Sequence, residues 1–93
     1  MLKLGGTGVS DVQIELALLT LIRQRGPHSS ACPSEVARSL LPGDWRTLMP
    51  RVRAVAACLA QAGTLQISQR GIVVSPQGPW KGPIRVRLPH DKK

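Results

Sequence analysis

Residues 32–63, CPSEVARSLLPGDWRTLMPRVRAVAACLAQAG, contain the pattern that decides the fold. Pro33 suits the first position of a helix, because that position needs no backbone N–H donor. Glu35 can reach back to cap the same helix start. The inward face then repeats at helical spacing, at Val36, Ala37, Leu40 and Leu41. Pro42 and Gly43 end this helix, and so short a connection to the next segment is typical of a helix-turn-helix.

The segment after this connection predicts a longer helix that runs to about Ala62. Its apolar residues recur at helical spacing, at Val52, Val55, Ala56 and Leu59. Pro50 interferes, because a proline deep in a helix removes a backbone hydrogen bond and clashes with the preceding turn. Two alternatives follow: either residues 45–49 form a separate short turn, or the main helix begins only two or three residues before Pro50.

Upstream of this pair, residues 11–25 predict a first helix. Ser10 can cap its start, the acids near that start and the arginines near its end suit the helix dipole, and Gly26-Pro27 ends it. The helix is apolar on more than one face, which indicates a central position in the fold.

Downstream, the pattern changes to the alternation of β-strands. Residues 65–68, 72–74 and 84–88 predict three strands, with a turn at Arg70-Gly71 and a Pro/Gly-rich loop at 76–83. Three helices followed by a small antiparallel β-hairpin or sheet predict an α+β domain, specifically a winged helix-turn-helix. We expect the domain to span residues 10–88, between a flexible segment at 1–9 and a flexible basic tail at 89–93.

Several stretches together resemble a known family: CPSEVAR at 32–38, Trp45-Arg46 with Leu48-Met49-Pro50 and Val52-Arg53, Gln69-Arg70-Gly71, and GPIRVR at 82–87. The chain is similar over roughly residues 10–88 to a small bacterial family known only as a domain of unknown function, with a winged-helix-like fold. The resemblance implies the fold. It implies no activity and no catalytic residues.

The charge is distributed unevenly along the chain. Residues 1–44 carry four basic and four acidic residues, whereas residues 45–93 carry nine basic residues against Asp91 alone, which accounts for the whole net charge of +8. Such asymmetry favours a polyanionic partner for the second half. We expect duplex DNA, because only two aromatic residues, Trp45 and Trp80, are present to stack on single-stranded bases.

The candidate nucleic-acid-binding residues are cations and one amide on the third helix, the turn, the loop and the last strand: Arg46, Arg51, Arg53, Gln61, Arg70, Lys81, Arg85 and Arg87. The alternative is a protein-interaction or homodimerisation module without any nucleic-acid role. It would use the small residues Ala54, Ala57 and Ala60, an exposed strand edge at 84–88, or Trp80, for which packing and contact roles are equally compatible with the sequence.

Other functional classes find little support. No pair of acids is placed for acid–base catalysis, no histidine or cysteine has a ligand partner at metal spacing, and no phosphate-binding glycine motif is present. We therefore expect no enzyme, cofactor, metal or small-molecule substrate. The two cysteines, Cys32 and Cys58, are expected to be reduced and mostly buried. No stretch reaches the length of a membrane span, so a cytoplasmic protein is expected.

Overall fold

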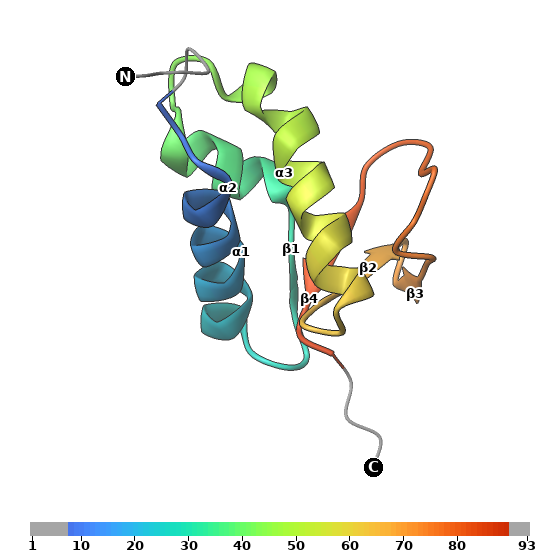
Figure 1. Cartoon of the computed structure of the whole chain (residues 1–93). Coiled ribbons are helices and arrows are strands. Elements are labelled where there is room, and N and C mark those ends of the chain that lie inside the picture. The colour runs from blue at the N-terminus through green and yellow to red at the C-terminus, as the bar shows by residue number, and fades with distance from the viewer. Residues whose placement is uncertain (1–7, 90–93) are drawn as a thin grey trace.

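The computed structural model describes residues 8–89, so most of the two expected flexible ends, at 1–7 and 90–93, lies outside the described residues. The elements follow in the order α1 (Asp11–Arg25), β1 (Ser30–Ala31), α2 (Pro33–Leu40), α3 (Trp45–Gln61), β2 (Gln66–Gln69), β3 (Ile72–Val73) and β4 (Arg85–Arg87). The predicted α+β class is confirmed, with three helices and a small antiparallel sheet (Figure 1).

The first two helices start as their sequences predict. The Ser10 hydroxyl accepts a hydrogen bond from the backbone N–H of Gln13 at 3.2 Å, and the Gln13 side chain accepts one from Ser10 N–H at 2.8 Å. At the start of α2, a carboxylate oxygen of Glu35 accepts the backbone N–H of Cys32 at 3.0 Å. Each pairing satisfies N–H groups that the first turn of a helix leaves without a partner.

Helix α3 corrects both expectations for Pro50, because it is continuous from Trp45 to Gln61 with Pro50 inside it. The proline stands close to the helix start, so only one backbone hydrogen bond is lost. Leu48 and Val52, which flank it one turn apart, are both fully buried. Their burial offsets the cost of the proline, and Thr47 secures the first turn by donating to the Asp44 carbonyl at 2.8 Å.

The sheet has the strand order β1-β4-β2-β3 and is antiparallel throughout. Val86 of β4 lies opposite Ala31 of β1 and opposite Ile67 of β2, and this row faces the core. Strand β1 was not predicted. Because β4 is paired on both sides, the expectation of an exposed strand edge at 84–88 is wrong; among the four strands the outer positions belong to β1 and β3.

The core lies where the three helices meet the inner face of the sheet. Its fully buried large side chains come from every helix and from the two central strands with the residues directly before them: Ile14, Leu18, Ile22, Val36, Leu48, Val52, Leu65, Ile67, Ile84 and Val86. Residues 76–83 run alongside α3 on the side away from α1 (Figure 1). This arrangement leaves one side of α3 open for contacts, whereas on the outer face of the sheet Arg85 is exposed and Ser68 is buried.

Candidate functional site

The outward side of α3 is basic and lined with small residues. No acid occurs anywhere between Trp45 and Gln61. Opposite the buried side of the helix, a stripe of exposed or half-buried residues runs its whole length: Arg46, Pro50, Ala54, Ala57 and Gln61. We call these five residues the α3 stripe. Small side chains in the middle of the stripe let another molecule approach the helix closely, while Arg46 and Gln61 offer hydrogen-bond donors at its two ends.

Arg53 joins the edge of this stripe to the 76–83 loop. Its Nη2 donates to the carbonyl of Gly82 at 3.3 Å, and its Cζ lies 5.6 Å from the centroid of the Trp80 ring. The indole N–H of Trp80 in turn donates to the Ser75 carbonyl at 2.8 Å, which closes the loop on itself. Trp80 is half-buried and packs against the core, so packing rather than full exposure describes its place in the structure.

Trp45 connects α3 with α2. The Cζ atoms of Arg38 and Arg46 lie 4.4 and 4.5 Å from the centroid of its ring. The indole is half-buried at the edge of the core. Arg38 was missed as a candidate, because nothing local in its helix indicates that it meets Trp45 across the Pro42-Gly43 connection.

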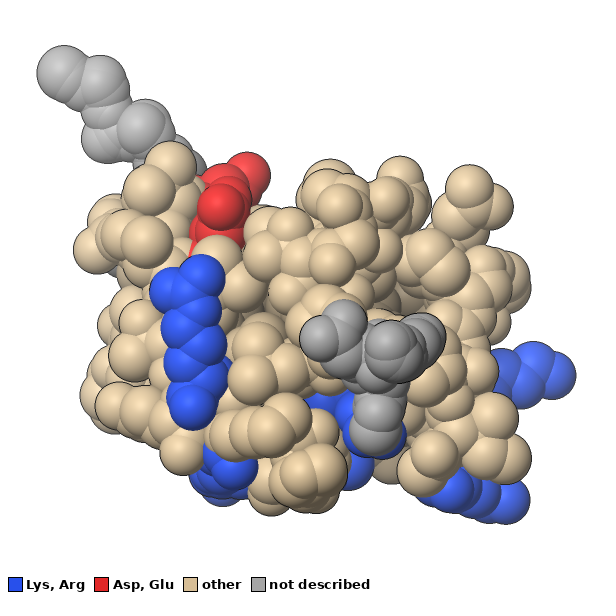
Figure 2. Space-filling view, turned by 90° about the horizontal axis from the view of Figure 1, so that it is seen from below, with Lys and Arg blue, Asp and Glu red and all other residues tan. Residues whose placement is uncertain are grey.

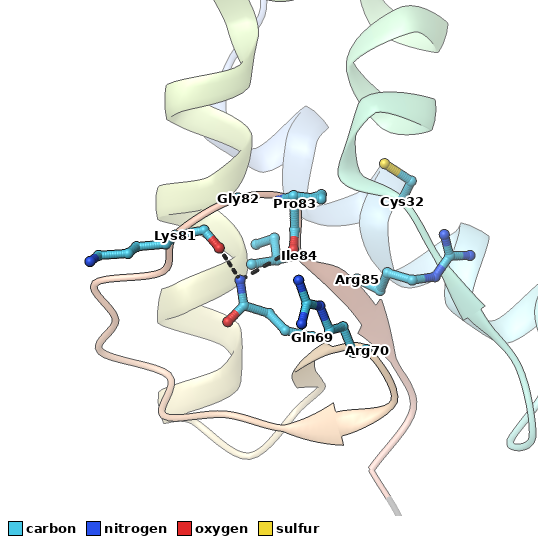
Figure 3. Close-up of a pocket in the computed structure, with 8 residues that line it drawn as sticks. All are labelled: Cys32, Gln69, Arg70, Lys81, Gly82, Pro83, Ile84 and Arg85. Atoms are coloured by element: carbon cyan, nitrogen blue, oxygen red, sulfur yellow. Dashed lines mark hydrogen bonds between the residues drawn. The ribbon is translucent and has the colours of Figure 1, made fainter.

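A second basic feature is a cavity of about 490 Å³ between the β2–β3 turn, the start of β4 and the start of α2 (Figure 3). Its lining includes three basic residues and no acid: Cys32, Gln69, Arg70, Lys81, Gly82, Pro83, Ile84 and Arg85. The Gln69 amide shapes one wall by donating to the carbonyls of Lys81 at 2.7 Å and Pro83 at 3.3 Å. Figure 3 shows the guanidinium of Arg70 lying over this cavity, whereas the Lys81 side chain points away from it.

The third basic residue of the cavity, Arg85, is turned toward β1. Its Nε donates to the Ser30 hydroxyl at 2.6 Å and its Nη2 to the Ser30 carbonyl at 3.0 Å. Arg87 shares the outer face of the sheet with Arg85, in register with Ser30 and Gln66. Both arginines therefore belong to the sheet surface, at some remove from the α3 stripe.

An acid lies near this part of the sheet as well. Burial raises the pKa of Glu35, but its hydrogen bonds with Cys32 N–H and Arg25, and the charges of Arg25 and Arg85, together lower that pKa below its ordinary value. Glu35 is thus held as a carboxylate. It compensates part of the positive charge of Arg85.

Arg51 lies on the opposite flank of α3 from Arg53. Its Nη2 donates to Oδ1 of Asp11 on α1 at 2.8 Å. The eight predicted residues therefore fall into separate groups. Arg46, Arg53, Gln61 and Lys81 border α3 and the loop; Arg70, Arg85 and Arg87 lie on the hairpin and sheet; Arg51 faces α1. The face seen in Figure 2 likewise carries basic side chains in separate places with uncharged surface between them.

Within the described residues, 8–89, no cluster of histidine, cysteine, aspartate or glutamate could hold a metal ion. No helix there is both long enough and apolar enough to cross a bilayer. The two cysteines are free, and Cys58 is exposed, which corrects the expectation that both thiols are mostly buried.

The fold and site together define a small α+β domain in which a basic third helix lies beside a loop that carries Lys81. The chain belongs to the family Protein of unknown function (DUF3253), whose model matches residues 11–89. The resemblance to a family of unknown function is thereby confirmed. A comparison with curated proteins gave no match.

Proposed function

We propose that this domain binds duplex nucleic acid in the manner of a winged helix, with the α3 stripe in the major groove and the hairpin and 76–83 loop on the backbone. The order of three helices and then a hairpin supports this docking, in which the third helix is the one that enters the groove. At 1.5 Å per residue, α3 is about 25 Å long, enough to cross a major groove roughly 12 Å wide.

The observation that carries the proposal is the contact of Arg53 with Trp80 and Gly82. It holds the loop against the flank of α3, and the proposed interface uses Lys81 of this loop together with the α3 stripe. Arginine and glutamine can donate to base edges and phosphates, and the alanines between them permit close approach. Arg53 itself is a positioning residue in this proposal, because its guanidinium is already engaged within the protein.

Arg70 is the candidate phosphate contact at the hairpin tip. Its backbone has a φ of +53°, a left-handed conformation that residues other than glycine seldom adopt. A glycine or an asparagine would fit this turn with less strain. An arginine at such a position is expected when its positive charge has a functional role. Arg51 is left out of the proposed interface, because it faces α1 and pairs with Asp11.

The decisive experiment is a titration of the protein with a labelled 20-base-pair duplex of random sequence at several salt concentrations. About four phosphate contacts would make log K fall against log salt with a slope of about −4. Absence of binding at low salt would end the proposal. The proposal involves no catalytic step and assumes a cytoplasmic location.

A matched pair of variants separates a defined interface from general charge attraction. Arg46→Gln and Arg51→Gln each remove one positive charge from α3, but only Arg46 belongs to the α3 stripe. We expect Arg46→Gln to weaken binding about five- to tenfold and to reduce the salt slope by about one. Arg51→Gln should change affinity by less than about twofold. Equal losses in both variants would mean that net charge alone drives binding, against the proposed interface.

A further inference from the structure

The outward face of α1 carries an apolar stripe that nothing in residues 8–89 covers. Val12 is 64% exposed and Leu16 is 59% exposed, and because they lie one helical turn apart they form a contiguous apolar patch rather than isolated exposed side chains. With the half-buried Leu19 and the exposed Arg23, they are spaced by four, three and four residues and so follow one line along the helix. This spacing is the one that lets two helices pack side by side.

The charges of α1 are arranged so that the helix complements itself in the antiparallel direction. Asp11 and Glu15 lie in its first half, and Arg23 and Arg25 lie in its second half. Asp11 and Arg25 already have partners, Arg51 and Glu35. Glu15 and Arg23 are exposed and form no ion pair with any residue between 8 and 89. Two antiparallel copies of α1 would bring each Glu15 toward the Arg23 of the other copy.

The shape of this face also suits a second helix. The exposed apolar stripe of α1 stands as a ridge between two grooves. One groove, of about 340 Å³, is shared with α3, and the other, of about 360 Å³, is shared with α2. Val12 borders the first groove and Leu16 borders the second. A ridge flanked by grooves is the surface that helix-to-helix packing requires, because the ridge of one helix enters the groove of the other.

Electrostatics favour α1 as the place where two copies of a strongly basic chain meet. The chain has a formal charge of +8, and like charges would oppose contact through α3 or the sheet. The two acids and two arginines of α1 balance each other, so its surface is locally neutral. A second copy is therefore the occupant that both the charge pattern and the spacing of α1 match.

From these observations we infer that two copies of this chain pair through antiparallel α1 helices, with Leu16 and Leu19 at the crossing and Glu15–Arg23 ion pairs on either side. A helix of 15 residues buries only a small interface, so the dimer dissociates with a Kd on the order of micromolar. The inference does not rest on the proposed nucleic-acid function. It leaves the α3 stripe of each copy uncovered.

The test is sedimentation equilibrium of the whole chain from about 5 to 500 µM, without nucleic acid. The mean mass should rise toward that of a dimer. Leu16→Glu should weaken association at least about tenfold, because it places a charge at the crossing. Ile72→Glu is the matched control: Ile72 is 69% exposed on β3, far from α1, and its substitution should leave the dimer unchanged.

Charge exchange supplies a second readout that does not depend on the apolar contact. Glu15→Arg alone should weaken the dimer because it faces Arg23 of the other copy, and adding Arg23→Glu should restore it. Circular dichroism of each variant is the control that shows whether it is folded. Three results would each overturn the inference. The first is a monomer at every concentration, and the second is a dimer that is lost in Ile72→Glu but kept in Leu16→Glu. The third is a double variant that associates no more tightly than Glu15→Arg alone.

Discussion

The guanidinium of Arg53 lies 5.6 Å from the centroid of the Trp80 ring, and this contact ties the middle of α3 to a loop 27 positions later in the chain. The same guanidinium donates to Gly82, so one side chain holds the loop at two points. The 76–83 loop is thereby held against the flank of the third helix. The position of Lys81 beside the α3 stripe depends on Arg53.

Arg53→Met should loosen this loop, because methionine keeps an unbranched apolar stem but has neither the charge nor the donor. A cation–π contact and a hydrogen bond, each on the order of 1 kcal/mol, are lost, so the melting temperature should fall by about 8–16 °C. Amide hydrogen exchange across residues 76–83 should accelerate. Lys81→Met removes a charge from the same loop without these contacts and should leave exchange unchanged. Unaltered exchange in Arg53→Met would refute the bridging role.

Arg70→Asn should separate stability from binding. Arg70 and Gly71 both have positive φ, 53° and 83°, and Asn-Gly is the pair that such a two-residue hairpin turn favours. The free energy of unfolding should therefore stay equal or rise by up to about 1 kcal/mol. Affinity for duplex should fall several-fold, since a phosphate contact is removed. Urea unfolding and the duplex titration measure the two effects, and a less stable variant would contradict this explanation of the turn.

The parts of the fold that sequence reasoning could predict are those with local causes. The cap at Ser10 and the Glu35 carboxylate at the start of α2 act within three residues, so their signals are visible in the chain. Strand β1 has only two residues, and Ser30 pairs with Arg87, which lies 57 positions later. Nothing near Ser30 encodes that pairing. Pro50 is tolerated for a similar reason, because the burial of Leu48 and Val52 depends on the rest of the core.

The candidate site shows the same division. Arg51 and Arg53 are two residues apart, and a helix turns about 200° over that interval, so they had to point to different flanks. Which flank meets α1 and which meets the loop is decided by packing between elements distant in the sequence. The list of basic residues could be drawn up from the chain, but its separation into an α3 group, a sheet group and Arg51 could not.

Cys58 should react quickly with a thiol reagent in the native protein, because it is exposed, whereas Cys32 is only half-exposed and its Sγ lies 3.0 Å from the Ser34 hydroxyl oxygen. Titration with Ellman's reagent should show one fast phase and one slower phase. Cys58→Ser should remove the fast phase and Cys32→Ser the slow one. Two equally slow thiols would contradict the exposure of Cys58.

Leu48→Ala should be among the most destabilising single changes in α3. Leu48 is fully buried beside Pro50, so its truncation leaves a cavity and removes the packing that offsets the proline. Loss of about 2–5 kcal/mol is expected from chemical denaturation. Ile72→Ala removes a similar apolar volume from an exposed position and should cost less than about 0.5 kcal/mol. Similar losses for both would mean that β3 is more buried than it is in the structure.

Glu35 should make the free energy of unfolding depend on pH only in the acidic range. Burial raises its pKa, but the Cys32 N–H, Arg25 and the nearby Arg85 lower it by more, so the pKa of Glu35 in the folded protein lies below its ordinary value of 4.5. A carboxyl group with a lowered folded pKa stabilises the protein fully above its unfolded pKa and loses that effect as pH falls through the folded value.

Glu35→Gln keeps an oxygen that can accept a hydrogen bond from Cys32 N–H but removes the ion pair with Arg25. In that pair the Arg25 side chain is 36% exposed and the Glu35 side chain is 34% exposed. Because solvent screens such a pair, the loss at pH 7 should be no more than about 1 kcal/mol. The difference between the two proteins should shrink as pH falls below the ordinary carboxyl value of 4.5 and vanish once pH lies well below the folded pKa of Glu35, in denaturant melts at matched ionic strength. Asp44→Asn removes the same charge from an exposed acid whose side chain makes no hydrogen bond at the start of α3, and it is the control for loss of a negative charge at pH 7. A gap between Glu35→Gln and the unaltered protein that persists at pH 2 would show that the carboxylate charge is not its cause.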